Sequence, residues 1–92
     1  MWLAITQIVP VHAAEPPCDK YPAARETLCR DIWKQLNDQA IADIAQFGLA
    51  QQQKREAGQI TAAQHLAENM AFIKASTDQR LKKLDERMAA GK

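Results

Sequence analysis

Two cysteines are the residues of this 92-residue chain whose type and spacing point most directly to chemistry. Cys18 and Cys29 are its only cysteines, and ten residues separate them. Thiol oxidoreductases usually place two cysteines two residues apart at the start of a helix, which lowers the pKa of one thiol. The spacing here does not match that arrangement. We therefore favour a structural disulfide, with a redox pair and an intermolecular bridge to a partner as the alternatives.

The two cysteines can reach each other if a short N-terminal strap folds back along a helix. If the helix begins at Pro22, Cys29 lies ~10 Å along its axis. The four steps from Pro22 back to Cys18 span up to ~13 Å when extended. We therefore predict a strap over residues 15–21 that its two prolines keep extended. The predicted disulfide would stabilise so small a domain by ~3 kcal/mol.

A metal site is the next chemistry to consider. His65 and Glu68 are three residues apart on one helical face and could share a metal ion. A usable site needs three or four ligands, and the helix before them offers only Asp38 and Asp43, neither of which lies on its apolar stripe. We expect no metal site and no cofactor, and we rank a metal carrier using His65 and Glu68 as the weakest alternative.

Catalysis and nucleic-acid binding find little support in the remaining residues. Residues 15–92 include one histidine and three glycines. These residues provide neither a nucleophilic triad nor a phosphate loop. The formal net charge is +1, and the basic residues near the C-terminus alternate with acidic ones. Such a pattern is typical of a solvated helix face. We predict that the protein is not an enzyme and binds no nucleic acid.

Composition indicates one helical domain. The chain is 47% hydrophobic and 25% charged, with only three glycines, four prolines and 5% aromatic residues. These values favour a folded, mostly helical protein over disorder. No run of residues alternates in the way that a strand would. The fold class predicted from the sequence is therefore all-α.

The first predicted helix covers residues 22–56. Its apolar side chains recur in steps of three and four, as expected for one face of an amphipathic helix. These residues are Leu28, Ile32, Leu36, Ala40, Ile44 and Phe47. Gly58 lies where a left-handed C-terminal cap is usually found, which places a turn at residues 57–60.

The second predicted helix covers residues 61–89. Thr61 followed by Gln64 matches a capping box, and the apolar positions that follow are close to a heptad repeat. They are Ala63, Leu66, Met70, Ile73, Leu81, Leu84 and Met88, with Thr77 filling one step. Two long helices joined by a short turn predict an antiparallel hairpin over residues 22–90, stapled by the strap.

The first fourteen residues are predicted to be a secretory signal peptide. Residues 1–14 contain no charged side chain, and small residues precede Glu15, where a signal peptidase would cut. No Lys or Arg precedes the apolar run, so we expect the leader to be truncated. The run is too short to span a membrane, which takes about 20 residues. We expect a bacterial periplasmic or secreted protein; a short element packed on the body is the alternative.

A hairpin of two helices leaves part of its apolar surface uncovered. Candidates for this exposed flank are Trp33, Ile41, Met70, Phe72 and Met88. Exposed apolar surface of this extent usually marks an interface. A second hairpin could cover it in a four-helix bundle, and so could a partner in the cell envelope.

We therefore expect a non-catalytic exported helical interaction protein, either an accessory subunit of a cell-envelope assembly or a homo-oligomer. The alternative is an inhibitor or immunity-type protein that binds a secreted enzyme or toxin. No motif in the sequence decides between them.

Overall fold

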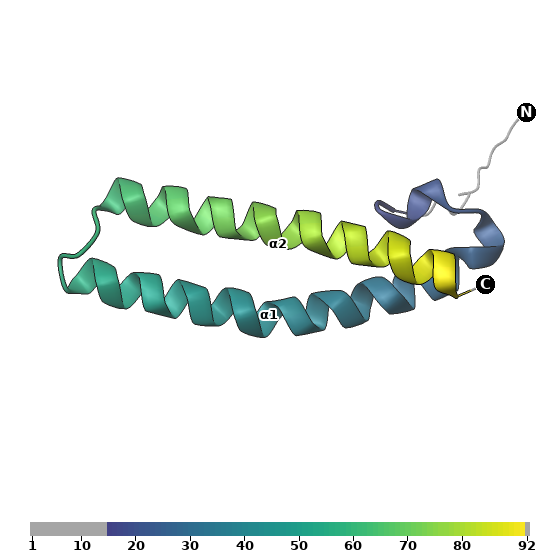
Figure 1. Ribbon diagram of the computed structural model, residues 1–92, viewed down its shortest axis with the longest axis horizontal. Helices are drawn as coiled ribbons and strands as arrows, with labels where there is room; N and C mark the ends of the chain where they lie inside the picture. The colour runs from purple at the N-terminus through teal and green to yellow at the C-terminus, as the bar shows by residue number, and fades with distance from the viewer. Residues whose placement is uncertain (1–14, 92) are drawn as a thin grey trace, which may run out of the picture.

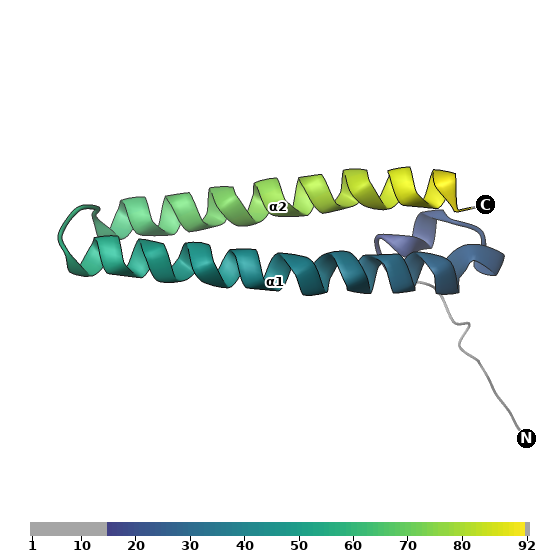
Figure 2. The same cartoon turned by 60° about the horizontal axis from the view of Figure 1, so that its bottom comes forward.

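Two long helices lie side by side and antiparallel in the computed structural model of the protein, as Figures 1 and 2 show. The structure describes residues 15–91. Helix α1 spans Glu26–Glu56 and helix α2 spans Ala62–Ala90. Two short 3-10 helices precede them, η1 at Cys18–Lys20 and η2 at Ala23–Arg25. The described part of the chain contains no strand, so the predicted all-α antiparallel hairpin is confirmed.

The turn between the helices begins with a glycine cap on α1. Gly58 has a φ of 74°, a left-handed conformation that glycine adopts without steric cost. The N–H of Gln59 donates to the carbonyl of Lys54 at 2.8 Å, and the N–H of Gly58 donates to the carbonyl of Arg55 at 3.1 Å. This pair of bonds is the Schellman motif. It ends α1 at Glu56, the residue that the sequence predicted.

Helix α2 begins with the predicted capping box. The Thr61 hydroxyl accepts from the N–H of Gln64 at 3.0 Å, and the Gln64 side chain accepts from the N–H of Thr61 at 2.8 Å. Two backbone groups that the helix itself cannot pair are thereby satisfied. Thr61 is the cap itself, and the helix begins one residue later at Ala62.

The segment before α1 forms tight turns, including the 3-10 helix η1. This differs from the extended strap that we predicted over residues 15–21. The N–H of Cys18 donates to the carbonyl of Glu15 at 2.9 Å, and the N–H of Tyr21 donates to the carbonyl of Cys18 at 3.2 Å. An extended strap would leave these groups without partners in the chain, whereas turns pair them. Helix α1 consequently begins at Glu26, because the 3-10 helix η2 occupies the first turn of the predicted helix.

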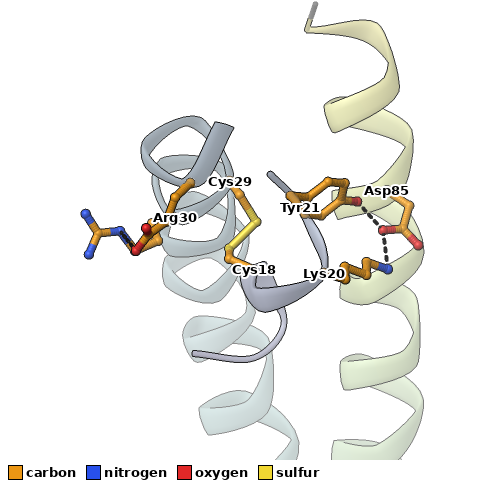
Figure 3. Close-up of a disulfide and its surroundings, with 7 residues drawn as sticks. Cys18, Lys20, Tyr21, Cys29, Arg30 and Asp85 are labelled. Atoms are coloured by element: carbon orange, nitrogen blue, oxygen red, sulfur yellow. Dashed lines mark hydrogen bonds and ion pairs between the residues drawn. A yellow bond between two sulfur atoms is a disulfide. The ribbon is translucent and has the colours of Figure 1, made fainter. Parts of the chain in front are cut away.

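The predicted disulfide joins the strap to α1. Cys18 and Cys29 are bonded, with their Cα atoms 5.8 Å apart, and both are buried (Figure 3). The strap therefore lies along the first turns of α1 beside the C-terminal end of α2. The predicted signal peptide lies outside the described residues.

The apolar core is confined to the end of the hairpin that carries the disulfide. Leu36 of α1 and Leu84 and Met88 of α2 pack with the two cysteines, and Tyr21, Ile32 and Trp33 pack against this cluster. We call this part the disulfide half, comprising residues 15–40 and 77–91. The remainder, residues 41–76, is the turn half.

Candidate interaction surface

The seam between the two helices is largely polar in the turn half. Gln51 is only 1% exposed, and its Nε2 donates to Oε1 of Glu68 at 2.5 Å. One turn further on, a guanidinium nitrogen of Arg55 lies 3.3 Å from Nδ1 of His65. The side-chain oxygen of Asn69 is buried and has no hydrogen-bond partner among the described residues. Apolar contact therefore contributes less to pairing the helices here than in the disulfide half.

Aromatic side chains occupy the middle of the seam. The rings of Phe47 and Phe72 stack with centroids 4.2 Å apart and planes 5° from parallel. The Arg80 guanidinium lies 5.5 Å from the centre of the Trp33 ring and donates to Oδ1 of Asn37 at 2.5 Å. Both Phe72 and Trp33 are half-buried by contacts within the chain.

Five large apolar side chains of the turn half face outward. On α1, Ile41 is 63% exposed and Leu49 is 57% exposed. On α2, Leu66 is 63%, Met70 62% and Ile73 46% exposed. An exposed apolar residue standing alone is ordinary, whereas a contiguous patch marks a binding surface. The contacts between the two helices show which of these five side chains lie together.

The seam contacts fix which residues of the two helices lie level with each other. Gln51 pairs with Glu68, and Phe47 stacks on Phe72. Residue 49 is midway between 47 and 51, and residue 70 is midway between 68 and 72. Leu49 and Met70 therefore lie at the same height along the hairpin.

Contacts at both ends show that Ile41, Leu66 and Ile73 lie on one side of the hairpin. Arg80 bonds both Asn37 and Thr77, which lie one helical turn before Ile41 and one after Ile73, so each pair shares a helix face. Near the turn, Leu66 lines a shallow hollow of about 230 Å³ together with Arg55.

Met70 lies on the same stripe of α2, four residues after Leu66 and three before Ile73. Leu49 points away from α2 instead, because the seam residues Phe47 and Gln51 lie two positions to either side of it. We call the surface formed by Ile41, Leu66, Met70 and Ile73 the apolar face.

The other side of the hairpin is mixed in character. A small hollow of about 90 Å³ on that side is lined by Leu36 and Ala40 together with polar residues, among them Asp43 and Gln79. A second hollow, of about 280 Å³, adds Phe72 and Ala75. None of the large apolar side chains of the described residues that are most exposed lines either hollow.

The predicted interface residues have different positions in the structure. Ile41 and Met70 belong to the apolar face. Phe72 lies in the seam against Phe47, and Trp33 packs on the disulfide-half core. Met88 is 1% exposed and is part of that core, so it is not available to a partner. The heptad position that we assigned to an exposed flank is covered by α1 and the strap.

The apolar stripe of α2 leaves the seam where we predicted that it would stay inside. Leu66 and Ile73 were expected to face α1, and both are exposed. Leu66 and Met88 are 22 residues apart, three heptads plus one residue, so on a straight α-helix their side chains point within about 40° of each other. The stripe keeps its direction along α2, whereas the line of contact with α1 moves around the helix. The stripe is thus inside the hairpin at the disulfide end and outside it near the turn. The inward positions of the turn half are instead His65, Asn69, Phe72 and Ser76.

Leu49 is an exposed apolar residue that the sequence reasoning missed, and it lies on the side of α1 that points away from α2. It follows Ile41 by two helical turns, with Ala45 between them. This second, shorter stripe runs beside the main apolar stripe of α1. The spacing of four residues from Ile41 to Ala45 and from Ala45 to Leu49 could have indicated this stripe in the sequence.

Asp85 ties the strap to α2 (Figure 3). Its Oδ1 accepts from Lys20 Nζ at 2.7 Å and from the Tyr21 hydroxyl at 2.5 Å. The hydrogen bond from Lys20, followed by that from Tyr21, lowers the pKa of Asp85 below its ordinary value. The same bond raises the pKa of Lys20, whereas burial is the main cause of the raised pKa of Tyr21. This group of contacts is structural, because it closes the disulfide end.

The residues considered for metal binding do not converge. His65 lies against Arg55, and Glu68 accepts from Gln51. Within residues 15–91, no group of three or more His, Cys, Asp or Glu side chains is arranged to hold a metal ion. Both residues therefore belong to the polar seam.

No protein-family model matches this chain, and comparison with curated proteins and with solved structures finds no significant match. Within the described residues, neither helix is both long and apolar enough to cross a membrane. The apolar face is thus the feature of the molecule from which a function can be argued.

Proposed function

We propose that the protein is a non-catalytic, exported helical interaction protein that presents the apolar face to a protein partner. The observation that carries this proposal is the position of Ile41, Leu66, Met70 and Ile73 on one side of the turn half, each about half exposed or more. A soluble monomer rarely keeps a patch of this kind uncovered. The disulfide half supplies the rigid support from which the face extends.

Export is the second element of the proposal. Disulfides persist in oxidising compartments such as the bacterial periplasm, and small exported domains often need them for stability. The Cys18–Cys29 bond supports such a location. Mass spectrometry of the protein from its native host should find this bond intact and residues 1–14 removed; free thiols in a cytosolic fraction would contradict export.

The interaction itself is tested by affinity capture from the cell envelope with three baits. The wild-type chain should retain a partner that the Met70→Lys variant loses, because a charge at the centre of the apolar face prevents its burial. Ala71→Lys is the matched control, since Ala71 is exposed and lies one turn before Ala75, which lines the larger hollow on the other side. Loss of capture by both variants, or by neither, would count against the apolar face as the binding surface.

A further inference from the structure

We draw no further inference here: the strongest candidate, the apolar face of the turn half, belongs to the interaction surface already proposed, and nothing among the described residues shows what covers it.

Discussion

At the disulfide end of the hairpin, a few polar side chains connect the segment before α1 to the C-terminal end of α2. Arg25 extends from η2 and donates to the backbone carbonyls of Met88 at 2.6 Å and Gly91 at 3.0 Å. Met88 belongs to the last turn of α2 and Gly91 is its C-cap. Carbonyls at this end have no partners within the helix, and positive charge is favourable there. Arg25 and the Asp85 contacts thus attach the segment before α1 to the end of α2, 63 and 64 residues away.

Breaking the Cys18–Cys29 bond should lower stability without removing the helices. The bond restricts the unfolded chain over a sequence separation of 11 residues, and loss of a native disulfide from a small domain costs about 2 to 5 kcal/mol. Thermal unfolding followed by circular dichroism, with and without reductant, should show a lower melting temperature on reduction. The helical signal at 20 °C should be largely retained. A Cys18→Ser/Cys29→Ser double variant should behave like the reduced chain and should not respond to reductant. An unchanged melting temperature would contradict a stabilising role.

Asp85 should contribute to stability at neutral pH and lose that contribution in acid. The hydrogen bonds from Lys20 and Tyr21 lower its pKa below the ordinary 3.8. The unfolded chain therefore binds a proton more readily at this group, and stability falls as the pH drops through 3.8 toward the folded pKa. Asp85→Asn should lose less stability than the wild type between about pH 4 and pH 2, measured by urea unfolding. Glu86→Gln controls for the loss of one negative charge from α2. Equal acid losses in wild type and Asp85→Asn would refute this role.

At the scale of the helices, two glycines should respond in opposite ways to the same substitution. A Cβ built on either Gly48 or Gly58 would meet no atom within 4 Å, so the difference depends on the backbone alone. Gly58→Ala should destabilise the fold by about 1 kcal/mol, because alanine adopts the left-handed φ of 74° only at a cost. Gly48→Ala should stabilise α1 by roughly 0.5 to 1 kcal/mol. Urea unfolding measures both. A destabilising Gly48→Ala would show that this position tolerates no side chain.

Local signals in the sequence predicted the turn between the two helices. Which side of α2 contacts α1 could not be predicted. Gly58 and the Thr61–Gln64 box act over a few residues, so they identified the turn correctly. Whether Leu66 faces α1 depends on how much the two helices coil around each other, because Leu66 and the buried Leu84 point in the same direction on a straight α-helix. That coiling results from packing along the whole seam, including a buried Gln51 that composition alone would place at the surface. The disulfide was predictable because the chain has only two cysteines and their spacing does not match a redox pair. The reach estimate assumed an extended strap, and the sequence did not predict the 3-10 turns that replace it.

At the scale of the whole molecule, the hairpin has one well-packed half and one half whose apolar surface faces outward. The buried cluster of Leu36, Leu84, Met88 and the disulfide lies in the disulfide half. The turn half is held by Gln51–Glu68, Arg55–His65 and the stacked phenylalanines. Hydrogen bonds of this kind contribute less net stability than the burial of large apolar side chains does. The isolated hairpin should therefore be less stable toward its turn.

This asymmetry predicts the pattern of amide hydrogen exchange along the chain. Local opening occurs at lowest cost where few apolar contacts must break, so amides of residues 44–56 and 62–73 should exchange faster in dilute solution than those of residues 29–40 and 80–88. Uniform exchange rates along both helices in a dilute, monomeric sample would contradict the asymmetry, because they would mean that the polar seam holds the turn half as firmly as the apolar core holds the other.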